Sequence, residues 1–148
     1  MEKDRLQPRE IASDRLLDDI RNIIEQGRRQ AYAAANRIAV LTYWYIGRRI
    51  VEEEQHGEVH AQYDTRLIKT LAERLTLKYG NTFSKRNLAY YREFYLEFRD
   101  VEILHTRVQN LTWSHVRRLL SVSNTQAREW YAKEASEQMW SVRTLNRF

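Results

Sequence analysis

The sequence predicts an all-α fold in which a long N-terminal helix is followed by four or five shorter helices with a helix-turn-helix-like centre. Four glycines and one proline in 148 residues leave little turn material for β-hairpins. Alanine, leucine, arginine and glutamate, which favour helices, are plentiful. Apolar residues recur at steps of three and four along most of the chain, which is the period of an amphipathic helix.

Composition excludes several classes of protein and site. The chain has no cysteine, which excludes disulfides, thiolate metal sites and a cysteine nucleophile, and fits a reducing cytoplasm. His56 and His60 have i, i+4 spacing but no HExxH motif. The longest apolar run, Ile38 to Ile46, is too short to span a bilayer, and no signal peptide is visible. We therefore expect a cytoplasmic protein with no metal, no cofactor and no membrane contact.

The N-terminal part predicts a coiled-coil seam. Residues 1–12 read as a flexible leader, because Pro8 disfavours a helix interior, and residues 13–148 read as a single helical domain. Beyond Ser13 or Asp14, either of which can cap a helix, apolar and small residues alternate at steps of three and four as far as Leu41 and Tyr45. We expect a homodimer through this seam; the alternative is packing within one chain. The seam consists of Leu17, Ile20, Ile24, Gly27, Ala31, Ala34 and Ile38.

The centre of the chain predicts two consecutive helices. The first is capped by Asp64 or Thr65 and stops at Gly80, a residue suited to a left-handed conformation. The second is capped by Ser84 and carries an aromatic face, with Lys85, Arg86 and Arg92 pointing away from it. A basic helix anchored by aromatics is typical of nucleic-acid binding. The alternative is a core helix with solvated charges.

The positive charge is concentrated around this second helix. The net charge is −2 over residues 1–65, +6 over residues 66–118 and +1 over residues 119–148, and arginines outnumber lysines by 20 to 5. Arginine suits phosphates and base edges. We expect DNA, rather than RNA, to be bound mainly through phosphates by Lys85, Arg86, Arg92, Arg117 and Arg118. Tyr90 is expected to pack against a neighbour rather than stack on a base, and Asn87 to cap or brace.

The rest of the chain predicts further short helices. Thr112 can cap one helix, Ser123 with Gln126 fits a capping box for the next, and Trp140-Ser141 starts the last. Leu145 and Phe148 read as apolar residues left uncovered, which suggests a following segment. Glu52, Glu53 and Glu54 are expected on a solvated face. The predicted core contains Leu41, Trp44, Ile46, Ile50, Leu71, Leu75, Leu88, Tyr91, Phe94, Trp113, Val116, Leu120 and Trp130.

Several blocks of the sequence together resemble the N-terminal domain of the YhcG-type proteins, bacterial nucleases with a C-terminal catalytic domain of the PD-(D/E)xK superfamily. The similarity covers roughly residues 15 to 148, and no block by itself identifies a chemistry. The blocks are Leu41-Thr-Tyr-Trp-Tyr-Ile-Gly-Arg-Arg-Ile-Val-Glu-Glu-Glu, Leu71-Ala-Glu-Arg-Leu, Tyr79-Gly-Asn-Thr-Phe-Ser-Lys-Arg-Asn-Leu, Tyr91-Arg-Glu-Phe-Tyr, Leu111-Thr-Trp-Ser-His and Trp140-Ser-Val-Arg-Thr-Leu.

The resemblance implies a helical module that binds DNA or protein and precedes a nuclease domain. None of the five lysines has an aspartate or glutamate two positions before it, so the (D/E)xK motif is absent from this sequence. No nucleophile, base and orienting group form a visible set either. We therefore expect no catalytic residues here, and a function in binding DNA. The alternative is a dimerisation and protein-interaction module that positions a nuclease.

Overall fold

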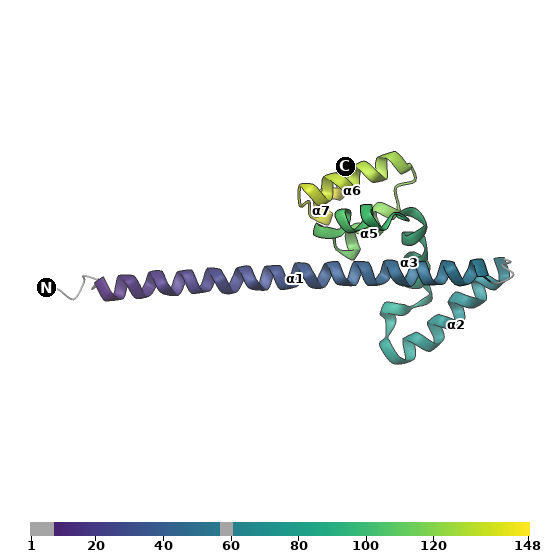
Figure 1. The fold of residues 1–148 in the computed structure, drawn as a ribbon, viewed down its shortest axis with the longest axis horizontal. Coiled ribbons are helices and arrows are strands. Elements are labelled where there is room, and N and C mark those ends of the chain that lie inside the picture. The colour runs from purple at the N-terminus through teal and green to yellow at the C-terminus, as the bar shows by residue number, and fades with distance from the viewer. Residues whose placement is uncertain (1–7, 57–60) are drawn as a thin grey trace. The chain divides into compact units, whose positions relative to one another are not determined.

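The computed structural model describes residues 8–56 and 61–148, and within those ranges every regular element is a helix (Figure 1). The all-α prediction is confirmed, with six shorter α-helices rather than four or five after the long one in the described residues. The α-helices are α1 (Pro8–His56), α2 (Ala61–Tyr79), α3 (Lys85–Glu97), α4 (Val101–Arg107), α5 (Trp113–Leu120), α6 (Thr125–Glu137) and α7 (Val142–Asn146). Two 3-10 turns, η2 (Asn81–Phe83) and η3 (Val108–Asn110), lie between them.

The chain divides into two compact units, residues 1–35 and residues 36–148, and α1 contributes to both. This helix begins at Pro8, several residues before the predicted start. Proline is compatible with a first helical turn, because the N–H it lacks has no partner there. Residues 1–7 of the predicted leader lie outside the described residues.

The core of the second unit forms around the last turns of α1. Trp44 is 1% exposed, and its indole Nε1–H donates to the Phe98 carbonyl at 2.7 Å. Buried residues from α3 to α7 join it in one cluster, which includes Phe94, Leu104, Leu119 and Ala132. A second cluster, centred on Ile50, Leu88 and Tyr91, includes the inner face of α2.

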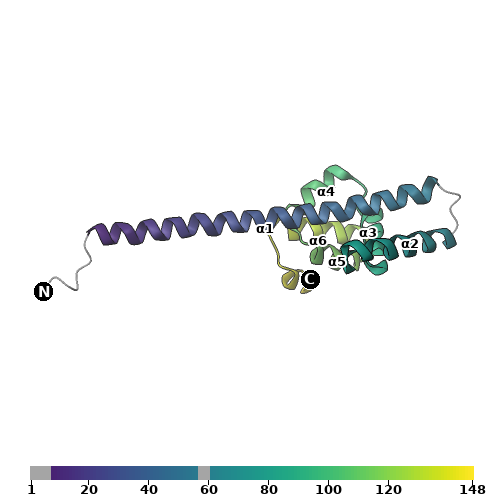
Figure 2. The same ribbon diagram turned by 90° about the horizontal axis from the view of Figure 1, so that it is seen from below.

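α3 lies beside α1 (Figure 2). Their close approach depends on a glycine. A Cβ placed on Gly47 would lie 1.9 Å from the Tyr91 carbonyl oxygen, so only glycine allows this approach. The same tyrosine stacks on Tyr43 with ring centroids 4.3 Å apart, and its hydroxyl donates to the Thr82 carbonyl at 2.8 Å. Backbone and aromatic contacts therefore fix α3 on α1.

The predicted helix-turn-helix-like centre is present. α2 and α3 pack on each other and are joined by η2. Gly80 ends α2 with φ +86°, a value that favours glycine. Ser84 caps α3 as predicted, its hydroxyl accepting from the Asn87 N–H at 3.2 Å. α2 begins at Ala61, before the predicted caps.

The C-terminal helices follow the predicted order with one changed cap. Thr112 caps α5, and His115 completes a capping box. Asn124, rather than Ser123, caps α6, its Oδ1 accepting from the Ala127 N–H at 2.8 Å. Ser141 caps α7.

Most of the predicted core is confirmed. The fully buried members are Trp44, Ile50, Leu88, Tyr91, Phe94, Val116 and Leu120. Five others are half-buried against the clusters: Leu41, Ile46, Leu71, Leu75 and Trp113. Leu145, expected to be uncovered, is 4% exposed, whereas Phe148 is 63% exposed.

The prediction for Trp130 was wrong, since this side chain is 50% exposed. The buried face of α6 instead carries small residues and Arg128, which is 4% exposed. That arginine donates from Nη2 to the Glu97 carboxylate and from Nη1 to the Val122 carbonyl at 2.8 Å. A hydrogen-bonded cation therefore occupies the inner face where the sequence pattern placed an indole.

Candidate nucleic-acid interface

Two of the predicted basic residues meet on one tyrosine. Arg86 and Tyr90 are one turn apart on α3, and Arg117 reaches the same ring from α5. The guanidinium carbons lie 5.7 Å and 4.7 Å from the ring centroid, respectively. Both distances are within the range of a cation–π contact. The tyrosine thus brings together two cations from different helices.

The electrostatics of Tyr90 reflect these neighbours. The pKa of its phenol is lowered, chiefly by the hydrogen bond from Arg86 and next by the hydrogen bond from Arg117. Tyr90 packs against the core on its other side, as predicted, so its ring is a fixed support for the two arginines.

An open groove of about 320 Å³ lies beside this cluster. Arg118, another of the predicted basic residues, lines the groove. Its Nη1 donates to the Ser121 hydroxyl at 2.5 Å. The groove is lined by guanidinium, hydroxyl and amide groups together with apolar surface such as Val142, and its polar groups are donors suited to an anion. Its lining consists of Tyr90, Ser114, Arg117, Arg118, Ser121, Val142 and Asn146.

The local sequence of α5 explains why its arginines face outward. His115, Val116, Leu119 and Leu120 are buried on one side of this helix, which leaves Arg117 and Arg118 exposed on the other. Lys85 is exposed at the first residue of α3, where no contact fixes it. We name the set of Lys85, Arg86, Tyr90, Arg117 and Arg118 the basic face.

Arg92 does not share this arrangement. Its Nε donates to both carboxylate oxygens of Glu54, at 2.7 Å and 3.0 Å. The Glu54 side chain is 5% exposed, so the prediction of a solvated position was wrong for this glutamate. Arg92 therefore compensates a buried charge, and we assign it this structural role rather than a phosphate contact. Asn87 braces, as predicted, by donating to the Asn81 carbonyl at 3.2 Å.

The sequence reading missed the groove residues. Ser114, Ser121 and Asn146 carry no motif, and only the folding of α7 against α5 brings them together. The i, i+4 spacing of Arg86 and Tyr90 was the one local signal available. Arg117 joins them through tertiary packing, which no spacing reveals.

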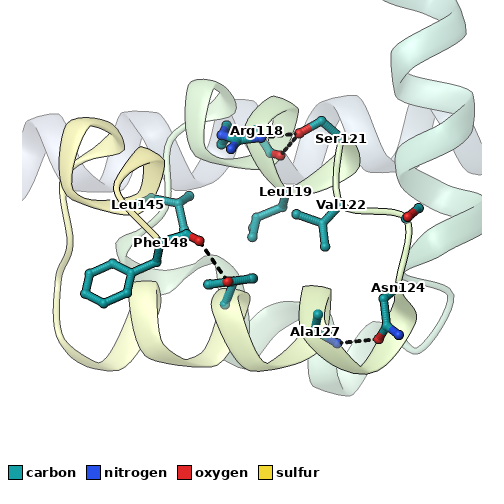
Figure 3. Close-up of a pocket in the computed structure, with 10 residues that line it drawn as sticks. Arg118, Leu119, Ser121, Val122, Asn124, Ala127, Leu145 and Phe148 are labelled. Atoms are coloured by element: carbon teal, nitrogen blue, oxygen red, sulfur yellow. Dashed lines mark hydrogen bonds between the residues drawn. The ribbon is translucent and has the colours of Figure 1, made fainter.

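A second cavity, of about 400 Å³, lies between α5, α6 and α7 (Figure 3). Its lining combines apolar side chains such as Leu119 and Leu145 with polar groups, several of which hold the helices together. The Ser121 hydroxyl donates to the Arg118 carbonyl at 2.6 Å, and the Tyr131 hydroxyl donates to the Phe148 carbonyl at 2.9 Å. Asn124 caps α6. Several polar groups of this cavity therefore have structural roles, and Arg118 and Ser121 line both this cavity and the groove.

Six of the seven predicted seam residues are exposed, and Ala34 is half-buried. Every side chain from residue 13 to residue 33 is exposed, and the fractions are 46% for Leu17, 43% for Ile20 and 47% for Ile24. Leu16 and Ile23 beside them are 59% and 68% exposed. Within its own unit, this stretch of α1 therefore buries none of these apolar side chains. In the second unit, Ile38 is 62% exposed.

The described part of the chain contains neither a cluster of metal-binding side chains nor a membrane-spanning helix. There, no three histidine, aspartate or glutamate side chains come together in a way that could hold a metal ion. None of the described helices is both long and apolar enough to cross a membrane.

Comparison with known proteins identifies the family. Residues 19–148 match the DUF1016 N-terminal domain. The chain is also 37% identical, over an alignment 159 positions long, to the protein named "Putative nuclease YhcG" of Escherichia coli strain K12. The alignment covers 88% of this chain and 42% of that protein, so the similarity is to part of a longer relative. No solved structure matches. The chain belongs to the DUF1016 N-terminal domain family.

Proposed function

We propose that this domain binds DNA through backbone phosphates, using Lys85, Arg86, Arg117 and Arg118. The observation that carries the proposal is the convergence of Arg86 and Arg117 on Tyr90, beside a groove that Arg118 also lines. Holding two like charges together is unfavourable without an anion nearby. A phosphate in the groove would supply that anion and accept from Arg117 and Arg118, which line it, with Arg86 on the other side of Tyr90 adding to the positive charge.

The proposed role in a longer protein is targeting. The relative is named a nuclease, and this chain aligns with less than half of it. We assign no catalytic step to this region, and place the phosphodiester chemistry in a separate nuclease domain, acting in the cytoplasm. The basic face would hold duplex DNA for that domain, giving affinity without reading sequence.

The test is the salt dependence of binding to a short random-sequence duplex. Arg86→Ala with Arg117→Ala should weaken binding and lower the logarithmic salt slope by about two, because each lost phosphate contact removes about one unit. Lys85→Ala should remove up to about one more. The measurement is fluorescence anisotropy over a salt series, together with melting temperatures.

The matched control is Lys69→Ala with Lys133→Ala, which removes the same charge from exposed positions on α2 and α6. Its slope should stay that of the parent. Equal slopes for all three proteins would show that the basic face is not the site. Unfolding of the first variant would make its arginines structural instead.

A second candidate function, self-association, is favoured by the uncovered seam. Neighbouring side chains Leu16, Leu17, Ile20, Ile23 and Ile24 expose a continuous apolar stripe on α1. Apolar surface of this kind marks an interaction site. The candidate is a homodimer through Leu17–Ile38, and it is compatible with DNA binding by the other unit. Sedimentation at micromolar concentration should show a dimer.

A further inference from the structure

The structure shows no contact that requires a glycine at position 27. Gly27 lies inside α1, where glycine weakens a helix relative to alanine. Its φ is not positive, and a Cβ added there would meet nothing within 4 Å. Gly47, in contrast, is required by the close approach of α3. A close contact with a second copy would supply a steric reason for a glycine at position 27.

The seam places its large and small residues in separate halves. Leu17, Ile20 and Ile24 come first, and Gly27, Ala31 and Ala34 follow. If a second copy runs in the opposite direction, heptad geometry sets each large residue opposite a small one. The facing pairs are Leu17 with Ala34, Ile20 with Ala31 and Ile24 with Gly27. One step further out, Ile38 faces Ser13.

Parallel pairing does not give this match. In register it would set Ile24 against Ile24 and then Gly27 against Gly27, followed by two alanine layers. The helices would be held apart at one end and leave voids at the other, whereas packed helices fill the space between them. In the antiparallel arrangement every layer has one large and one small side chain. The spacing of the two helix axes can then stay constant along the seam.

Charges beside the seam are compatible with the antiparallel arrangement. Arg21 of one copy comes beside Arg28 of the other. Glu25 lies four residues from Arg21 and three from Arg28 on its own helix, within reach of both. Glu25 of each copy can therefore pair with these arginines and offset the repulsion between them.

We propose that α1 pairs with α1 of a second copy as an antiparallel coiled coil in which Ile24 packs over Gly27. The inference rests on the self-association proposed above and adds its direction and register. The partner is a second copy because the stripe is complementary to itself when reversed. A different protein need not carry a matching order of large and small residues, whereas a second copy always does.

Cysteine cross-linking tests the direction, since the parent chain has no cysteine. Leu17→Cys and Ala34→Cys are made as separate proteins, one carrying an affinity tag, and are mixed and oxidised. In the proposed pair, positions 17 and 34 of different copies face each other within disulfide reach. Two copies of position 17 are about 25 Å apart along the axis, at 1.5 Å per residue over 17 residues. The mixture should therefore cross-link, and neither protein alone should.

Each other outcome overturns the proposal in an identifiable way. Cross-linking of Leu17→Cys with itself would establish a parallel pair, leaving self-association intact and the direction wrong. A sedimenting dimer without cross-links would place the interface elsewhere. A monomer would remove both proposals. Ser13→Cys mixed with Ile38→Cys repeats the test at the outermost layer, in case the first pair fails to assemble.

Discussion

His115 shows how a single side chain can connect stability to pH. Its Nδ1 accepts from the Thr112 N–H at 3.0 Å, and its Nε2–H donates to the Trp140 carbonyl at 2.7 Å. The ring must be neutral to make both bonds, because a protonated ring has no acceptor. Burial lowers the pKa of His115, and the hydrogen bond to Trp140 opposes this only in part. The neutral ring thus joins α5 to the segment before α7.

The first prediction for this residue is acid sensitivity. The unfolded chain has the ordinary histidine pKa of about 6.5, so below that pH it binds more protons at this site than the folded chain. The contribution of His115 to stability is therefore present above about pH 6.5 and is lost as the pH falls below it. Lowering the pH from about 7.5 to about 5 should reduce the melting temperature by a few degrees.

The comparison is between variants measured by circular dichroism. His115→Gln should lower the melting temperature at neutral pH and show a smaller further loss on acidification than the parent. His105→Gln is the control, because His105 is exposed and its variant should follow the parent. Parallel curves for all three proteins would exclude His115 as the titrating group.

Arg92 and Arg86 illustrate two uses of arginine on one helix. Arg92 pairs with a buried carboxylate, and removing it would leave that charge uncompensated, a costly change. Arg86 is exposed and rests on a tyrosine ring, so its removal exposes nothing buried. The sequence pattern places both side chains on the outward face of the helix. Their roles differ because Glu54, 38 residues before Arg92 in the chain, packs beside Arg92 in the fold.

At the scale of elements, two glycines in α1 should respond oppositely to the same methyl group. Gly47→Ala inserts a Cβ at 1.9 Å from a backbone oxygen, which forces α1 and α3 apart. We expect a loss of about 2–3 kcal/mol in the free energy of unfolding, the cost of overpacking. Gly27→Ala meets nothing and should instead gain up to about 1 kcal/mol of helix stability.

Urea unfolding of the two variants measures this difference, at a dilution where the chain is monomeric. Equal stability of Gly47→Ala and the parent would mean that α3 can shift without cost, contrary to the fixed crossing described here. A destabilised Gly27→Ala would mean that this part of α1 contacts something within the chain.

Most elements could be predicted because local signals determine them. Ser84 and Thr112 are caps whose function depends on the next few residues, and the aromatic face of α3 follows from helical period. Trp130 was misplaced because a period cannot show which of two faces is inward. Arg128 occupies the inward face of α6 because it pairs with Glu97 on another helix. The basic face was predicted only in part, again because tertiary packing decides it. The sequence predicts its arginines but not that Arg86 and Arg117 both contact Tyr90.

At the scale of the whole molecule, the two proposed activities belong to different units and should be separable. Ile24→Glu places a charge in the seam and should give a monomer in sedimentation. The variant should still bind a duplex long enough for one domain with the affinity of the parent. On a long duplex it should bind more weakly, because two linked sites gain from effective concentration. Loss of binding to the short duplex would show that the units depend on each other.

The exposed first half of α1 also has a consequence for backbone dynamics. A helix without tertiary packing is only marginally stable in water, so its amide protons should exchange rapidly with deuterium in a dilute sample. Between residues 13 and 33, where every side chain is exposed, protection should rise with protein concentration as copies pair. Around Trp44 and Gly47, where α1 is buried, protection should be high and independent of concentration. One helix would thus report, by hydrogen exchange along its length, both the stability of the folded unit and the occupancy of the seam.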